Sequence, residues 1–300
     1  MLENILFGQG FHILSNKHKG IALALVSTAL FVVVGALVRV LSERIHVFEI
    51  LLFRQLVFLV ILSPAIFTHW QSLIRPQYFA WHSARIVGAF VALSLSFLVV
   101  ANIPLADATA LGFTQVIFVA LISRLLLGEQ VNWQRVVVIV VGFVGVMLVI
   151  QPSFTSSSLN YIVLGLLSAL GAAIAVICVK KLTGKDSTTN ILAYQAVFVG
   201  VLAAIGAWFN WLTPSLYELM LLLAVGILSS IAQWFGITAY KYGEANVVSN
   251  IEYVKMIYAI CLGYFCFGEV PNQLAVLGAG ILMLSPLLPR LLNRLIGKPR

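Results

Sequence analysis

The sequence predicts an all-α membrane protein with ten transmembrane helices, arranged as two inverted five-helix repeats. Three observations predict this class: a very apolar composition, ten apolar runs of membrane-spanning length, and a short motif that recurs at about half the chain length. Hydrophobic residues make up 61% of the 300-residue chain and charged residues only 9%. A soluble domain usually carries about 25% charged residues because its surface faces water. The composition therefore favours a surface that faces lipid.

The ten predicted spans follow from the length of the apolar runs, because a membrane-spanning helix needs about 20 mostly apolar residues. The fifth run is short, and the ninth contains Glu252 and Lys255. The predicted spans are 20–41, 47–68, 80–101, 105–126, 133–150, 161–180, 189–211, 216–240, 245–267 and 271–290.

The same runs predict the organisation of the chain. Residues 20–150 and 161–290 form the two repeats, and the uncharged, Ser-rich segment 151–160 links them. Residues 1–19 form a cytoplasmic tail or an interfacial helix, and residues 291–300 form a basic cytoplasmic tail.

The distribution of Lys and Arg predicts the orientation, since positive residues accumulate on the cytoplasmic side of spans. With the N-terminus inside, the outer flanks hold only Arg39 and Arg44, and Arg54, Arg85 and Lys255 fall within spans. The cytoplasmic flanks hold Lys17, Lys19, Arg75, Arg124, Arg135, Lys180, Lys181, Lys185, Lys241, Arg290, Arg294, Lys298 and Arg300. We expect both termini in the cytoplasm and a multi-pass protein of a bacterial-type inner (plasma) membrane.

A motif near the end of the fourth span recurs at the end of the ninth. The fourth span ends in Leu-Gly-Glu at Glu129 and the ninth in Phe-Gly-Glu at Glu269, 140 residues later. At the same offset, Phe53-Arg54-Gln55 corresponds to Ala193-Tyr194-Gln195. Because each repeat has an odd number of spans, the second repeat enters the membrane inverted. Inverted repeats are typical of transporters that work by alternating access around a site near the membrane midplane.

These motifs resemble the EamA group of the drug/metabolite transporter superfamily. The most specific stretch is 251–271, which ends in Phe-Gly-Glu-Val-Pro and is similar to the ninth helix of a branch with S-adenosylmethionine carriers. Phe48-Glu49 and Phe53-Arg54 resemble the same branch, and the resemblance covers residues 18–290. It implies a carrier of small metabolites.

The chain departs from this family pattern at two helices. Many members carry a proline in the fourth and ninth helices, where this chain has Thr114-Gln115 and Val254-Lys255. A mechanism based on helix kinks is therefore not carried over.

Arg54 is the first candidate for substrate binding, because an ionisable side chain inside a span is costly and is usually retained for function. In the functional interpretation Arg54 anchors a carboxylate or another anionic group. In the structural interpretation it pairs with a neighbouring side chain or extends to the membrane surface.

Glu252 and Lys255 lie three residues apart, on one face of the ninth span. In one interpretation they form a self-neutralising ion pair. In the other, Glu252 binds a cationic substrate group or a coupling proton, and Lys255 tunes the pKa of Glu252. Together, Arg54 and Glu252 would hold the two charges of a zwitterion.

Polar and aromatic residues inside spans complete the predicted binding site. A glutamine within a span either binds substrate or, more commonly, joins two helices through a hydrogen bond. Both interpretations apply to Gln115, Gln195 and Gln233. Aromatic rings stack on flat or cationic ligands or lie at the membrane interface. The candidates are Gln115, Tyr194, Trp234, Tyr253 and Tyr258.

Other functional classes find little support in the motifs. The sequence has no HExxH, no GxSxG and no P-loop, so we expect neither an enzyme nor a metal or other cofactor. No basic patch with interleaved aromatics predicts nucleic-acid binding. The expected partners are a small-molecule substrate and the lipid bilayer, and the chain acts as a monomer or a homodimer.

Within the carrier class, proton coupling, exchange and facilitated diffusion all remain open. We expect a small polar or zwitterionic substrate of the amino acid or S-adenosylmethionine type, because opposite charges occur within spans. An exporter of amphipathic drugs or cations is the alternative in the same class. A lipid flippase and a non-transporting receptor are alternatives from other classes.

Overall fold

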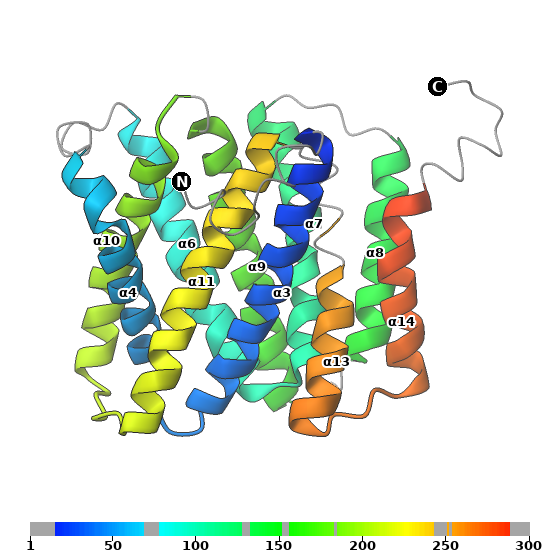
Figure 1. The fold of residues 1–300 in the computed structure, drawn as a ribbon. Helices are drawn as coiled ribbons and strands as arrows, with labels where there is room; N and C mark the ends of the chain where they lie inside the picture. Colours follow the sequence, from blue (N-terminus) through cyan, green and yellow to red (C-terminus); the bar gives the residue numbers. More distant parts are fainter. Residues whose placement is uncertain are drawn as a thin grey trace.

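The structure, a computed structural model, is a bundle of long helices whose axes run in similar directions (Figure 1). It describes residues 16–68, 78–127, 133–151, 156–182, 185–242, 251 and 254–288, and over these ranges the only regular elements are helices. The helices are α3 (Asn16–Leu41), α4 (Val47–Thr68), α6 (Phe79–Asn102), α7 (Leu105–Leu127), α8 (Trp133–Ile150), α9 (Ser156–Leu182), α10 (Thr188–Trp208), α11 (Leu216–Tyr242), α13 (Lys255–Phe267), α14 (Gln273–Leu284) and the 3-10 helix η2 (Ser285–Leu287).

Each predicted span overlaps one of these ten α-helices. The bounds differ most at α13, which begins at Lys255 rather than 245, at α14, which ends at Leu284 rather than 290, and at α9, which begins at Ser156 rather than 161. Residues 245–250, 252 and 253 of the ninth predicted span lie outside the described residues. In the described part of the chain, seven helices are long and apolar enough to cross a membrane, and three shorter apolar stretches lie in α8, α13 and α14. The structure therefore fits an all-α membrane protein, while ten crossings remain a prediction.

Local sequence signals explain where several helices begin and end. Ser187 caps α10, since its Oγ accepts the backbone N–H of Asn190 at 3.1 Å. Asn272 caps α14 in the same way, through the N–H of Ala275 at 2.8 Å. Gly268 ends α13 with a φ of 66°, a left-handed conformation that glycine adopts without steric cost.

The buried apolar side chains form two main clusters. One joins α3, α4, α6, α10 and α11 around residues such as Ile50, Leu51 and Val225. The other joins α7, α8, α13 and α14 around Phe113, Val146 and Leu282. Polar side chains that lie among the five helices of the first cluster are consequently far from water.

The outside of the bundle is itself apolar. Val60, Trp208 and Phe265 are 71%, 82% and 80% exposed, and many other large apolar side chains on the helices are exposed as well. Contiguous apolar surface of this kind is incompatible with water and marks a lipid contact.

Four helix pairs link segments that are distant in the sequence. The helix α4 packs against α10, α8 against α14, α6 against α9, and α3 against α11 (Figure 1). In each pair the first helix comes from one half of the chain and the second from the other half.

Candidate substrate-binding site

A buried polar network lies where α4, α6, α10 and α11 meet. Small residues on α10 allow α4 to approach closely: Ala196 is fully buried, and a Cβ added at Gly200 would lie 3.3 Å from Cβ of Gln55. Phe58 of α4 and Leu192 of α10 pack in the same interface. The tight apolar contact surrounds the polar side chains and excludes bulk water from them.

Three hydrogen bonds join two arginines through two glutamines. Arg54 Nη2 on α4 donates to Gln233 Oε1 on α11 at 2.9 Å. Gln233 Nε2 donates to Gln195 Oε1 on α10 at 2.8 Å, and Arg85 Nη2 on α6 donates to the same oxygen at 2.8 Å. Each guanidinium therefore contacts an amide oxygen, and the four helices are tied by one chain of contacts. We call these four residues the arginine–glutamine network.

Both arginines are buried, at 2% and 3% exposure for Arg54 and Arg85. Arg85 Nη1 donates to the backbone oxygen of Ile191 at 2.7 Å, whereas Arg54 Nη1 and Arg85 Nε are buried with no partner in the described part of the chain. Over the same residues, neither arginine forms an ion pair. A guanidinium stays charged in proteins, and each arginine at a helix centre costs about 2.5–3.5 kcal/mol on insertion scales. Among the residues that the structure describes, the network thus concentrates positive charge without an acidic partner.

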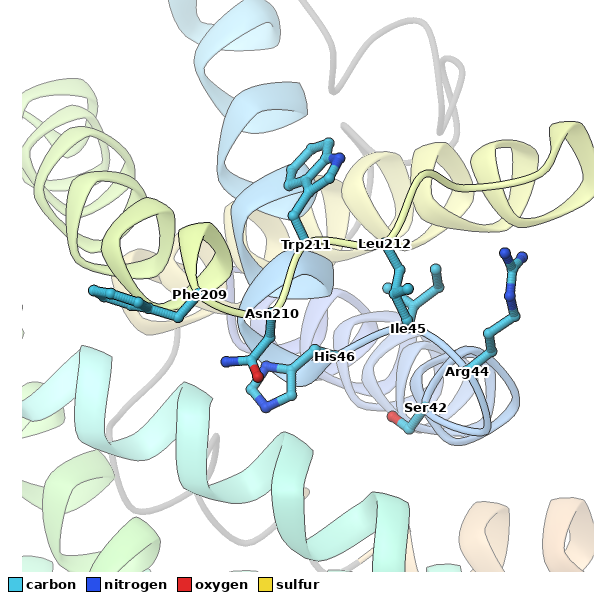
Figure 2. A pocket seen from close by; sticks show the side chains of 8 residues that line it. All are labelled: Ser42, Arg44, Ile45, His46, Phe209, Asn210, Trp211 and Leu212. Carbon is cyan, nitrogen blue, oxygen red and sulfur yellow. The ribbon is translucent and has the colours of Figure 1, made fainter.

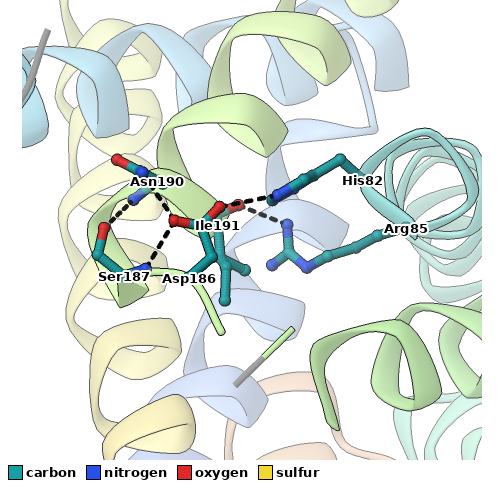
Figure 3. Close-up of polar contacts among 6 residues, drawn as sticks. All are labelled: His82, Arg85, Asp186, Ser187, Asn190 and Ile191. Carbon is teal, nitrogen blue, oxygen red and sulfur yellow. Dashed lines mark hydrogen bonds and ion pairs between the residues drawn. The ribbon is translucent and has the colours of Figure 1, made fainter. Parts of the chain in front are cut away.

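A second polar cluster lies next to Arg85, between the start of α6 and the start of α10. His82 Nε2 is 3.0 Å from Asp186 Oδ2, and Asp186 Oδ1 also accepts from the backbone N–H of Ser187 and from Asn190 Nδ2 (Figure 3). The ring of Tyr194 lies 4.6 Å from that of His82, between centroids. The carboxylate of Asp186 therefore contacts His82 and residues at the start of α10, and it does not pair with Arg85.

Two cavities lie at the opposite end of the bundle from this cluster. The first, of about 420 Å³, is lined by residues 42 and 44–46 after α3 and by 209–212 after α10 (Figure 2). The second, of about 330 Å³, is lined by Asp107, Gln151 and Glu269 among others. Neither cavity includes a member of the arginine–glutamine network.

The structure brings together only part of the predicted site. Arg54 belongs to the arginine–glutamine network. Tyr194 and Trp234 are the sequence neighbours of Gln195 and Gln233, respectively. Trp234 packs among apolar side chains of α3, α4 and α10. Glu252 and Tyr253 lie outside the described residues.

The other predicted residues lie on different helices. Gln115 is half-buried on α7. Lys255, at the start of α13, has its Nζ 5.7 Å from the ring centroid of Phe31, and Tyr258 packs near Val32. The helix α13 packs mainly against α3 and α7, so these residues approach the bundle from another side than Arg54 does.

Sequence reasoning missed Arg85 as a site residue. It identified Arg85 as a charge within a span, and that costly charge was the available signal. The helix-joining interpretation of Gln195 and Gln233 is confirmed by their mutual hydrogen bond. The sequence could not predict which helices these glutamines join, or that each accepts a hydrogen bond from an arginine, because both depend on how the helices pack.

Comparison with known families decides the class of the protein. The model of the EamA-like transporter family matches residues 18–151 and again residues 159–288. The chain belongs to the EamA-like transporter family. The resemblance seen in the sequence is thereby confirmed.

Named relatives of this EamA-like transporter are transporters. The S-adenosylmethionine uptake transporter of Rickettsia felis is 28% identical over 246 residues, 81% of this chain and 82% of the relative. The pseudopaline exporter CntI of Pseudomonas aeruginosa is 29% identical over 267 residues, 89% of this chain and 94% of the relative. The riboflavin transporter of Vibrio cholerae is 30% identical over 217 residues, 71% of this chain and 72% of the relative.

A solved crystal structure shares the fold of this EamA-like transporter. The TM-score is 0.73, with 94% of this chain and 100% of the solved chain covered, at 14% sequence identity. The similarity supports the helical architecture and carries no statement about substrate.

Proposed function

We propose that this EamA-like transporter moves a small polar or zwitterionic metabolite, of the amino acid or S-adenosylmethionine type, across an inner membrane by alternating access. The relatives named as S-adenosylmethionine uptake transporters support this substrate type. Transport by secondary coupling or by facilitated diffusion fits a chain with no P-loop.

The observation that carries the proposal is the position of the arginine–glutamine network between the two halves of the chain. Arg54 and Arg85 lie in the region of the first family-model match, and Gln195 and Gln233 lie in that of the second. A site between two halves is exposed to alternate sides when the halves rock against each other. The network is therefore the proposed substrate site.

The packing of the helices supports an inverted repeat. If the halves correspond helix by helix, the pair α6–α9 corresponds to α11–α3, and α7–α9 corresponds to α13–α3. The pairs α4–α10 and α8–α14 correspond to themselves. This is the contact pattern expected of two similar five-helix units related by an approximate two-fold axis.

The acidic end of the proposed site remains Glu252. Its predicted role is to bind the cationic group of the substrate or a coupling proton, and Lys255 follows three residues later in the sequence. Ile251, the residue before Glu252 in the sequence, packs with Leu23 of α3 and with Phe235 and Ala239 of α11. The predicted zwitterion clamp joins this segment to Arg54.

Counterflow in liposomes tests the proposal. Purified protein is reconstituted and loaded with unlabelled compound, and uptake of labelled S-adenosylmethionine, amino acids, nucleosides and lipophilic cations is measured. We expect saturable uptake of one zwitterion. Arg54→Gln and Glu252→Gln should each lower it about tenfold or more, because a charged hydrogen bond contributes about 1.5–3 kcal/mol.

Arg124→Gln is the matched control, because Arg124 is exposed in the last turn of α7 and undergoes the same chemical change. Uptake that survives Arg54→Gln and Glu252→Gln would refute the site and leave the carrier intact. Counterflow of lipophilic cations alone would favour the drug exporter. Absence of counterflow in folded protein would refute the carrier.

A further inference from the structure

Arg54 and Arg85 are presented to each other across the two glutamines. Both arginines donate to amide oxygens at 2.8–2.9 Å, and the two amides are linked at 2.8 Å. The amide oxygen of glutamine is uncharged, yet it occupies the position that a carboxylate oxygen takes in an arginine–carboxylate pair. The amides therefore act as neutral substitutes for an anion between two cations.

The described acidic side chains nearest to the network, Glu49 and Asp186, do not fill this role. Glu49, nearer the start of α4, is buried and accepts the backbone N–H of Leu212 at 3.1 Å. Asp186 contacts His82, Ser187 and Asn190. In the ranges that the structure describes, neither carboxylate lies within ion-pair distance of the two arginines.

Unused donors point to a ligand. Arg54 Nη1 and Arg85 Nε are buried and lack a partner among the described residues, although each belongs to a side chain that is at least nine-tenths buried. A buried donor without an acceptor is destabilising, and a bound acceptor removes that cost. A planar carboxylate suits a guanidinium because both oxygens can accept hydrogen bonds from it.

We infer that Arg54 and Arg85 together bind the carboxylate of the substrate, which inserts between them in place of the Gln195–Gln233 contact. Gln195 and Gln233 are positioning residues: they hold the guanidiniums in the empty state and turn their amide groups toward the bound carboxylate. The inference rests on the proposed function, and it assigns Arg85 and a carboxylate-bearing class of substrate to the same site.

Introducing a carboxylate into the network tests this inference directly. Gln233→Glu keeps the shape of the side chain and places a permanent carboxylate against Arg54. We expect the purified variant to melt a few degrees higher than the wild type without ligand and to lose counterflow at least tenfold. In Gln233→Glu combined with Arg54→Gln, the rise in melting temperature should disappear. Gln273→Glu, an exposed position at the start of α14, is the matched control.

Paired probes test the ligand separately. S-adenosylmethionine is compared with its decarboxylated form, and methionine with methioninamide, by thermal shift of the full-length protein in detergent. At least one carboxylate-bearing probe should stabilise the wild type, its carboxylate-free partner should not, and Arg85→Gln should abolish the shift. If Gln233→Glu does not fold, Gln195→Glu and this probe series still decide the question.

The outcomes separate this inference from the proposed function. Equal stabilisation and counterflow by a probe and its carboxylate-free partner would overturn the carboxylate site while the carrier stands. Wild-type counterflow by a stabilised Gln233→Glu would do the same, since the arginines would then be structural. If no compound shows counterflow, the proposed function fails. The thermal shifts then judge the inference alone, and the absence of any carboxylate-dependent shift overturns it.

Discussion

At the scale of single residues, Glu269 joins three elements at one end of the bundle. One carboxylate oxygen pairs with Arg39 of α3, and the other accepts the backbone N–H of Leu105 at the start of α7, at 3.2 Å. The guanidinium of Arg39 also lies over the ring of Phe267, 4.5 Å from its centroid. Gly268, in its left-handed conformation, turns the chain so that Glu269 follows the end of α13. The sequence motif Phe-Gly-Glu thus has a packing role here.

We therefore predict that Glu269→Ala destabilises the protein by about 2 kcal/mol, because two hydrogen bonds to a charged group are lost. The measurement is the melting temperature in detergent. Glu43→Ala, in the exposed connection after α3, is the control and should leave the melting temperature unchanged. Equal melting temperatures for Glu269→Ala and Glu43→Ala would mean that the contacts of Glu269 with Arg39 and Leu105 contribute nothing to stability.

The network illustrates why a charged residue in a span is hard to interpret alone. Arg54 and Arg85 carry the same charge and are similarly buried. That they belong to one network is evident only from the linked glutamines that they contact. Each contact comes from a helix in the other half of the chain. Such contacts are a property of packing and leave no spacing pattern in the sequence.

At the scale of helices, two crossings depend on glycines that contact each other's backbone. A Cβ at Gly88 of α6 would lie 2.7 Å from the carbonyl oxygen of Gly171 on α9. A Cβ at Gly278 of α14 would lie 2.6 Å from the carbonyl oxygen of Gly145 on α8. Both distances are too short for any side chain, so these helices approach as closely as their backbones allow.

Alanine substitution on α14 tests this packing within one helix. Gly278→Ala must push α8 and α14 apart, and we expect a loss of about 1–3 kcal/mol, in the range of overpacked cores. Gly280→Ala is the matched control, because a Cβ there meets nothing within 4 Å. It should be neutral or stabilising by up to about 1 kcal/mol through helix propensity. Similar melting temperatures for the two variants would contradict the crossing.

At the scale of the whole molecule, the connections between helices can each be placed at one of the two ends of the bundle. The connections after α3 and α10 line one cavity together, which places them at the same end (Figure 2). The segment between α9 and α10 lies at the other end of α10. With the predicted cytoplasmic termini, the first two connections face outward and the last faces the cytoplasm.

Cysteine labelling measures this orientation. The three native cysteines are replaced by alanine, and single cysteines are then introduced at Glu43, Thr213 or Lys185. All three positions are exposed. We expect a membrane-impermeant maleimide to label positions 43 and 213 on intact cells and position 185 only after permeabilisation. Labelling of position 185 on intact cells, with 43 and 213 protected, would reverse the predicted topology.

The sequence by itself determined the family, the apolar character and the approximate bounds of the helices. These properties are local or compositional: an apolar run of sufficient length, a Ser or Asn cap such as Ser187 or Asn272, and a Gly stop such as Gly268 act within a few residues. It also identified the rare charges within spans, because their cost does not depend on the partner.

Only the tertiary structure decided which of these polar residues meet. Arg85 joins Arg54 through Gln195 and Gln233, whereas Lys255 and Gln115 lie on helices that pack elsewhere. The physical reason is that an apolar helix with polar residues on several faces can be rotated and paired in several ways. Close contacts such as that of Gly200 on α10 with Gln55 on α4 select one of them, and the resulting packing brings two positive charges to one buried place.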